Sequence, residues 1–355
     1  MTKKNLFPFV LLIITVICYY TGPKFPEFFT YIYNQRIYKF LDIILHYLTK
    51  YIPFSVGDLV YAIVVLWVVY KSYYFLKRKL FRKFVLLIVT SVLLFLCLFQ
   101  LMWGLNNYKY SLAAQLELER NYTQSELDSL TYKLIKIVNE QQKQITKDIT
   151  DKVIIEKDLD LFNQTAKENY EKLPEALKNV LVSNPINDVK PSFYSTLQSY
   201  SGFSGYFNPF THENQVNIEI PTIGMPVTVA HEMAHQLGIA SESEANFFGY
   251  QVMKLSDDLR FQYAANLYAL KYCLKEYRIQ NEEAYQLLFL QLYPGVQQNI
   301  LDSEAFWESK RNISTFFFKH LYGRFLKINN QKDGIRSYNR FVDLLINYHK
   351  KNQEV

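Results

Sequence analysis

Residues 84–103 read FVLLIVTSVLLFLCLFQLMW and contain no charged side chain. A helix packed inside a soluble domain carries polar residues along one face, whereas this run is apolar all round. About 20 such residues cross the hydrocarbon core of a bilayer, which is about 30 Å thick. The run therefore predicts a transmembrane helix and makes the chain a membrane protein.

Two further apolar runs predict two more spans. One covers residues 54–75, where Asp58 and Lys71 lie toward the two ends and can reach the membrane interface. The other lies near residues 5–22 and follows two lysines. A cleaved signal peptide is the alternative for this first run. The apolar part of a signal peptide is usually shorter than this run, and a small-residue cleavage site follows it, which is missing here. We therefore predict three uncleaved spans.

Basic residues beside the spans predict their orientation, because short loops rich in Lys and Arg stay in the cytoplasm. Eight lie at the N-terminus or around the loop between the second and third spans: Lys3, Lys4, Lys71, Lys77, Arg78, Lys79, Arg82 and Lys83. The loop between the first and second spans has four: Lys24, Arg36, Lys39 and Lys50. We expect a multi-pass protein of the bacterial inner (cytoplasmic) membrane, with residues 107–355 extracytoplasmic.

The loop at 24–52 has apolar residues at helical spacing with charged residues between them. This pattern predicts an interfacial helix lying on the lipid bilayer. His46, the one histidine of the loop, is expected to be an ordinary interfacial side chain.

The distribution of charge excludes nucleic acid as a partner. The chain carries +6 in total, but residues 1–106 hold twelve basic and three acidic residues, which gives +9. The remaining 27 basic and 30 acidic residues give residues 107–355 a charge of −3. The excess positive charge belongs to the membrane anchor. The three cysteines also exclude a disulfide scaffold and a zinc ribbon.

From residue 107 the long apolar runs stop, and amphipathic helices predict a mainly α (α+β) domain over 107–355. A capping box at Thr123–Glu126 predicts a helix start, and a second helix is expected over 165–183. The sequence of this domain does not indicate an oligomeric state.

A strand is expected over 214–220, because Val216, Ile218 and Ile220 alternate with polar residues. It is expected to be the edge strand beside a cleft. After it, a helix is expected to begin near Val227.

That helix carries His231-Glu232-Met233-Ala234-His235, the HExxH motif. Residues i and i+4 share one helix face, so two imidazoles can converge on one zinc ion. Glu232 is turned about 100° around the helix axis, toward the open coordination position. There it can take a proton from water, whereas a helix with two structural core histidines has no need of it.

A third ligand is expected from the acidic stretch after the motif. Glu242 and Asn246 are spaced i, i+4, so Glu242 can bind the metal while Asn246 holds a ligating histidine. Glu244 is the competing ligand. On a helix it points about 160° away from Asn246, which favours Glu242.

This pattern resembles the glutamate-zincin metallopeptidases. The resemblance implies that His231, His235 and Glu242 bind zinc and that Glu232 is the general base. Asn246 stands where those proteins usually have Asp. The resemblance also implies a zincin-like fold for the domain.

A wider resemblance, to bacterial three-span proteins catalogued only as a domain of unknown function, covers nearly the whole chain. It is carried by residues 54–58 (FSVGD), 103–107 (WGLNN), 202–210 (GFSGYFNPF) and 325–338 (FLKINNQKDGIRSY), together with the zinc motif.

The expected function is a membrane-anchored zinc metallopeptidase acting on a peptide or protein substrate. Candidates for stabilising the oxyanion are His212, Tyr263 and Tyr338, with Tyr338 preferred because its segment is polar. Glu213 is expected either to line the cleft or to cap the helix. Lys327 and Arg336 are candidates for binding a substrate carboxylate, with a solvated surface position as the favoured alternative. The alternatives are a non-catalytic zinc-binding or scaffold protein and a zinc hydrolase of non-peptide bonds.

Overall fold

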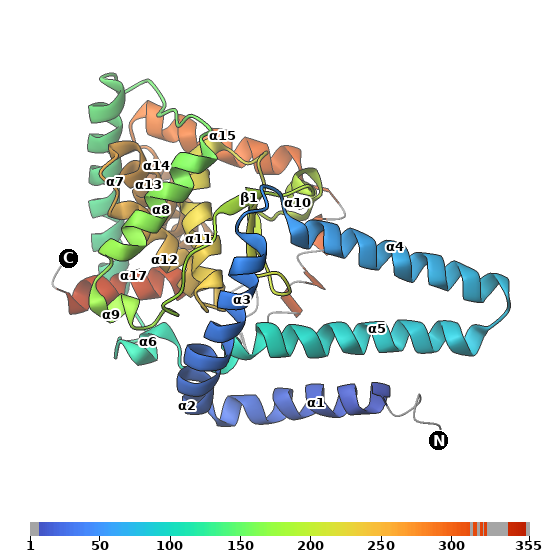
Figure 1. Ribbon diagram of the computed structural model, residues 1–355. Coiled ribbons are helices and arrows are strands. Elements are labelled where there is room, and N and C mark those ends of the chain that lie inside the picture. The colour runs from blue at the N-terminus through green and yellow to red at the C-terminus, as the bar shows by residue number, and fades with distance from the viewer. Residues whose placement is uncertain (1–6, 313–314, 318–319, 322, 325–339, 353–355) are drawn as a thin grey trace.

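The computed structural model describes residues 7–312, 315–317, 320–321, 323–324 and 340–352. Three long helices project from one side of a mainly helical domain (Figure 1). They are α1 (Phe7–Thr21), α4 (Val56–Lys77) and α5 (Phe81–Met102). Each belongs to a helical stretch that is long and apolar enough to cross a membrane, the first continuing to Lys24. The three predicted runs are therefore helical, which indicates a membrane protein.

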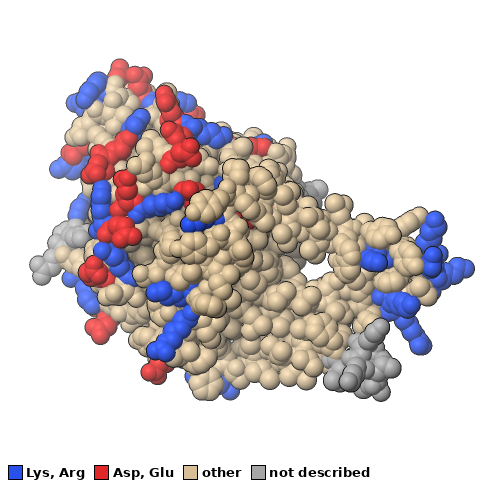
Figure 2. Space-filling view, viewed as in Figure 1, with Lys and Arg blue, Asp and Glu red and all other residues tan. Residues whose placement is uncertain are grey.

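The surface of these helices matches that role. Basic side chains gather where α4 and α5 are joined, far from the domain (Figure 2). Between this basic end and the domain, the face shown in Figure 2 is largely uncharged. Most apolar side chains of α4 and α5 point outward, as Leu66 (67% exposed) illustrates. Such a surface suits lipid contact better than water.

The segment between α1 and α4 is helical and has two different faces. It contains η2 (Gly22–Lys24), α2 (Pro26–Phe28), the π-helix η3 (Phe29–Tyr38) and α3 (Lys39–Thr49). Tyr38 and Asp42 are fully buried against the domain, whereas Phe40 and Leu48 are more than 60% exposed. His46 is buried too, so its prediction as an ordinary interfacial side chain was wrong. The segment is thus amphipathic as expected, but one face docks on protein.

The domain consists of helices around a small sheet. The α-helices are α6 (Leu112–Gln115), α7 (Gln124–Thr146), α8 (Leu159–Lys172), α9 (Glu175–Lys178), α10 (Ser195–Ser201), α11 (Met225–Gln236), α12 (Glu242–Lys254), α13 (Leu259–Gln280), α14 (Glu282–Phe289), α15 (Pro294–Ser309) and α17 (Arg340–Lys351). The described part of the domain also contains the short 3₁₀ helices η4 (Gly104–Tyr108) and η5 (Thr222–Gly224). This confirms the mainly helical prediction.

Local signals explain two of these helices. The capping box is present: Thr123 accepts a hydrogen bond from the Glu126 N–H, and the Glu126 carboxylate accepts one of 2.8 Å from the Thr123 N–H. The helix predicted over 165–183 is instead α8, which starts after the Asp158 cap and ends before Pro174. Proline disfavours helical conformation in the residue before it, so the chain breaks there and α9 follows.

Within the described residues the sheet has three short strands, β1 (Val189–Pro191), β2 (Gly205–Asn208) and β3 (Glu213–Val216). Their order is β1-β3-β2, with β3 parallel to β1 and antiparallel to β2. The prediction of an edge strand over 214–220 was therefore wrong, because β3 is central and ends at Val216. The Asn217 side chain accepts a 2.9 Å hydrogen bond from the Glu219 N–H and turns the chain. Among the described strands, β1 and β2 take the two edge positions.

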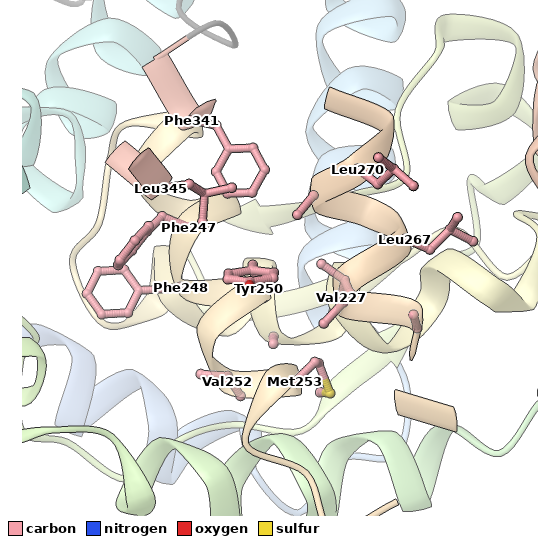
Figure 3. Packing of buried hydrophobic residues seen from close by; sticks show 14 of the residues in the cluster. Val227, Phe247, Phe248, Tyr250, Val252, Met253, Leu267, Leu270, Phe341 and Leu345 are labelled. Atoms are coloured by element: carbon pink, nitrogen blue, oxygen red, sulfur yellow. The ribbon is translucent and has the colours of Figure 1, made fainter. Parts of the chain in front are cut away.

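The core of the domain lies where α11, α12, α13 and α17 meet. Figure 3 shows apolar side chains of these helices packed together, among them Val227, Phe247, Leu270 and Phe341. The rings of Phe247 and Tyr348 are 5.1 Å apart, which fixes α17 on α12. Helix α11, which carries the HExxH motif, is thereby held inside the domain.

The start of α4 is bound into the sheet of the domain. Glu213 of β3 accepts hydrogen bonds from the N–H groups of Val56 (3.1 Å) and Gly57 (2.7 Å), and its carboxylate pairs with Lys190 at 2.7 Å. Asp58 is fully buried and accepts a 2.8 Å bond from the Phe193 N–H. The prediction that Asp58 reaches the membrane interface was wrong, and contacts cross the boundary expected at residue 106.

Candidate metal centre

Helix α11 brings two imidazoles together as the motif predicts. The Nε2 atoms of His231 and His235 are 3.1 Å apart, and their rings meet edge to face. One helical turn separates the two residues, so both side chains leave the same face of α11. The pair lies at the inner wall of a cleft.

His235 is held in one orientation by its other ring nitrogen. Nδ1 lies 2.6 Å from the carbonyl oxygen of Ile239, which the chain presents after reversing at Gly238 (φ +83°). A carbonyl only accepts, so Nδ1 carries the proton and Nε2 keeps its lone pair. Burial lowers the pKa of His235 to about 4, which keeps the imidazole neutral and able to bind a metal.

Glu242, the first residue of α12, faces both imidazoles. Its carboxylate oxygens lie 3.4 Å from His231 Nε2 and 3.8 Å from His235 Nε2. Glu244 points elsewhere, because its carboxylate accepts a 2.7 Å bond from the N–H of Leu112. Of the two carboxylates weighed from sequence, the geometry brings Glu242 to the histidines.

Asn246 lies one turn after Glu242 and links the site to α13. Its side-chain oxygen accepts a 2.7 Å bond from the Tyr268 hydroxyl, and its nitrogen donates to the Tyr272 hydroxyl at 3.3 Å. Burial by itself lowers the pKa of His231. Hydrogen bonding to Glu242 and Asn246, together with the charges of Glu232 and Glu242, outweighs burial, so the pKa is raised on balance. Asn246 is therefore close enough to His231 to affect its pKa, and its role in orienting a ligating histidine stays a prediction.

Glu232 is buried beside the histidines and beneath the edge strand. Burial raises its pKa to about 8, and its Oε2 atom has no hydrogen-bond partner within the described structure. A Cβ placed on Gly205 of β2 would come within 2.7 Å of Glu232 Oε1. The missing side chain at Gly205 is therefore what lets β2 run directly over this carboxyl group.

The donor set fits a zinc ion. Two ligands at 2.0–2.1 Å from a tetrahedral zinc stand about 3.3 Å apart. The three distances among the two Nε2 atoms and the Glu242 oxygens are 3.1, 3.4 and 3.8 Å. His231, Glu232 and His235 also form a group able to hold a metal ion, with ligand atoms within 4.8 Å of one another, and Glu232 Oε2 has no hydrogen-bond partner among the described residues. Two imidazoles and one carboxylate are the ligand set of a catalytic zinc.

The cleft in front of this cluster has a volume of about 1300 Å³. Strand β2 and the α10–β2 loop form one wall, and α13 forms another. The cleft also reaches side chains of α4 and α5, which the sequence did not predict.

Two of the residues expected to stabilise an oxyanion, His212 and Tyr263, do not line the cleft. His212 is fully buried elsewhere, with Nδ1 2.9 Å from Asp42 and Nε2 3.3 Å from the carbonyl of Met102. Tyr263 is also fully buried, and its hydroxyl donates a 2.9 Å bond to Asn299. Tyr338 lies outside the described residues, as do Lys327 and Arg336. Glu213 caps α4 instead of lining the cleft.

Sequence reasoning missed two tyrosines and a tryptophan at the site. Tyr268 and Tyr272 line the cleft and bond Asn246, and their i, i+4 spacing on α13 was the signal available. Trp103 stacks edge to face on His235 with ring centres 5.9 Å apart. It stands at the end of the third apolar run, and nothing local to it points toward residue 235.

The fold and the site define a mainly helical protein in which three apolar helices are joined to a cluster of two histidines and two glutamates. The chain belongs to a family described as a protein of unknown function (DUF3810), which matches residues 33–346. Comparison with curated proteins and with solved structures finds no match. The expected membership of an uncharacterised family is confirmed, and kinship with the glutamate zincins stays a prediction.

Proposed function

We propose that this protein is a membrane-anchored zinc metallopeptidase. The observation that carries the proposal is the convergence of His231, His235 and Glu242 beside the buried carboxyl group of Glu232. A purely structural site needs ligands but no adjacent general base. Three protein ligands also leave one coordination position open for water or substrate.

His231 and His235 would hold zinc through their Nε2 atoms, and Glu242 through its carboxylate. Zinc bound there supplies Lewis-acid chemistry, polarising the scissile carbonyl and lowering the pKa of water. Glu232 accepts the proton of the attacking water and delivers it to the leaving nitrogen. Its carboxyl group lies beside both ligating imidazoles and is therefore placed for both transfers.

Strand β2 is the surface on which an extended peptide would lie. Among the described strands it pairs on one side only, with β3, so its other edge can accept a substrate strand. Gly205 places the backbone of this edge directly beside Glu232. A bound peptide would thus lie beside the general base.

The clustered basic residues at the far end of α4 and α5 support a cytoplasmic location for that loop (Figure 2). The domain would then lie on the extracytoplasmic face of a bacterial inner membrane. Its substrate would be a peptide or protein present there.

The test uses the full-length protein in detergent, because contacts between spans and domain argue against isolating residues 107–355. Metal content is measured, and proteolysis of a peptide library is compared for wild type and Glu232→Gln. Loss of the general base should lower the rate about 10²–10⁴-fold while zinc stays bound.

A wild-type protein that binds zinc but cleaves no peptide above Glu232→Gln would overturn the proposal. The non-catalytic zinc-binding protein would then be the better interpretation. Hydrolysis of non-peptide esters or amides under the same conditions would identify the other alternative.

A further inference from the structure

The cleft of the candidate site is not confined to the domain. Its wall continues from His235 and Glu232 to Tyr61 on α4 and to Phe95 and Phe99 on α5. The two regions are joined by aromatic contacts. Trp103 packs on Phe99 with ring centres 5.7 Å apart, and on His235 at 5.9 Å.

The apolar end of the cleft lies within the depth of a bilayer. Phe95 is seven residues before Met102, the last residue of α5. At 1.5 Å per residue this is about 10 Å along the helix. If α5 crosses a hydrocarbon core of about 30 Å, the cleft reaches about a third of the way into it.

Among the described residues, the cleft extends to the side where α4 and α5 separate. Figure 2 shows an opening through the molecule beside the domain, in the place where Figure 1 has α4 and α5 running apart from each other. Phe95 is 46% exposed and contacts Phe210 with ring centres 5.3 Å apart. Tyr61 contacts Phe210 from α4 at 6.0 Å. Aromatic side chains from both spans therefore flank this end of the cleft.

We propose that the substrate is a membrane-anchored polypeptide, cut close to where it leaves the bilayer, which reaches the site between α4 and α5. This inference rests on the proposed peptidase function. The apolar end of the cleft suits a lipid-embedded segment, whereas the edge of β2 suits the extended chain that follows it. A soluble peptide would leave the apolar half of the cleft without a partner.

The geometry limits the distance between anchor and cleavage site. The ring contacts of 5.7 and 5.9 Å place Phe99 within about 12 Å of His235. An extended chain covers this distance in about four residues at 3.3 Å each. Cleavage is therefore expected within about four residues of the end of the apolar segment.

The test compares two peptides with full-length protein reconstituted in phospholipid vesicles. One carries an apolar segment of 20 residues followed by ten polar residues, and the other consists of the same ten polar residues alone. The anchored peptide should be cut at least tenfold faster, at the position given above, in wild type but not in Glu232→Gln.

Variants in the spans locate the entry. Phe95→Ala should slow cleavage of the anchored peptide at least fivefold without changing cleavage of the soluble one. Phe81→Ala, at the far end of the same helix, is the matched control because Phe81 is exposed and lies outside the cleft.

A binding measurement does not depend on activity. In the Glu232→Gln protein, a photo-crosslinking phenylalanine analogue at position 95 should capture the anchored peptide, and one at position 81 should not. Capture of lipid alone at position 95 would overturn the proposed entry.

The outcomes separate the two proposals. Glu232-dependent cleavage of both peptides at equal rates would overturn the membrane-anchored substrate and leave the peptidase standing. Cleavage of neither peptide, in protein that binds zinc, would remove the peptidase and the substrate class together.

Discussion

The carboxylate of Glu213 accepts a 2.7 Å hydrogen bond from the N–H of Gly57, although 156 residues separate them. The bond joins the central strand of the sheet to the first turn of α4, whose N–H groups have no partner within the helix. A negative charge at a helix N-terminus is also favoured by the helix dipole. Membrane anchor and domain are therefore one folded unit at this point.

Gly57 is predicted to tolerate no side chain. A Cβ there would lie 2.1 Å from Asn208 Nδ2 and 2.8 Å from Thr211 Oγ1. Gly57→Ala should therefore destabilise the protein by about 1–3 kcal/mol, because either the Asn208 and Thr211 side chains or the start of α4 must move. Thermal unfolding of the purified protein measures this.

Gly224→Ala is the matched control, since a Cβ at Gly224 meets nothing within 4 Å. It should change stability by less than about 0.5 kcal/mol. Equal melting temperatures for the two variants would show that the sheet does not hold α4 in this way.

The end of α11 is predicted to depend on Tyr38. Its hydroxyl donates a 2.9 Å bond to the carbonyl of Gln236, one of the helix-terminal carbonyls that lack a partner in α11. Tyr38 is fully buried, so in Tyr38→Phe water does not readily replace the lost donor. We expect a loss of about 1–3 kcal/mol in denaturant unfolding.

Tyr47→Phe, on the exposed face of the same segment, is the control for Tyr38→Phe. It should leave the unfolding midpoint in place. If both variants unfold at the wild-type midpoint, Tyr38 does not stabilise the helix that carries the HExxH motif.

Glu242 and Glu244 are predicted to differ sharply in zinc affinity. Glu242→Gln removes the carboxylate that faces both histidines and should weaken zinc binding at least about 100-fold. Glu244→Gln should change affinity less than about threefold, since its side chain bonds Leu112 instead. Competition with a zinc chelator at constant pH measures both. A larger loss in Glu244→Gln would reverse the assignment.

Orientation is predicted by the basic loop between α4 and α5. A cysteine introduced at Lys133 in the domain should react with a membrane-impermeant thiol reagent in intact bacterial cells, and one at Arg78 only after lysis. The native Cys97 and Cys273 are buried and should stay unlabelled. Labelling of the position 78 variant in intact cells would contradict the proposed topology.

Sequence patterns within one helix, or between one helix and the next, predicted the apolar helices and the meeting of the two histidines with Glu242. The uncharged run at 84–103 is a helix because apolarity over 20 residues has few other solutions. His231 and His235 converge because the spacing of four fixes their shared face. Glu242 reaches them because it begins the next helix directly after the reversal at Gly238.

Features that depend on distant pairs were not predictable in this way. Alternating residues at 216–220 indicated a strand, but only the pairing with β1 and β2 made β3 central. Tyr38 and Gln236 are 198 residues apart, and no local pattern connects them. The amphipathic segment at 24–52 was recognised, but its polar face could not reveal that it docks on the domain.

The final prediction concerns the pH dependence of stability through Lys109. Its Nζ atom is buried without a hydrogen-bond partner among the described residues, although the residue as a whole is partly exposed. Burial lowers its pKa to about 8, against the opposing effect of Glu244. Between pH 8 and about 10.5 the unfolded chain therefore binds one more proton than the folded protein, so stability rises with pH.

The size of this effect follows from the shift. A difference of about 2.5 pKa units corresponds to at most about 3 kcal/mol gained between pH 8 and 10.5. Lys109→Met removes the titrating group and should be more stable than wild type at pH 7, by an amount that shrinks as pH rises to 10.5. Denaturant unfolding at pH 7, 8, 9 and 10 compares the two proteins directly. A stability difference that stays constant over this range would show that Lys109 is charged in the folded protein throughout.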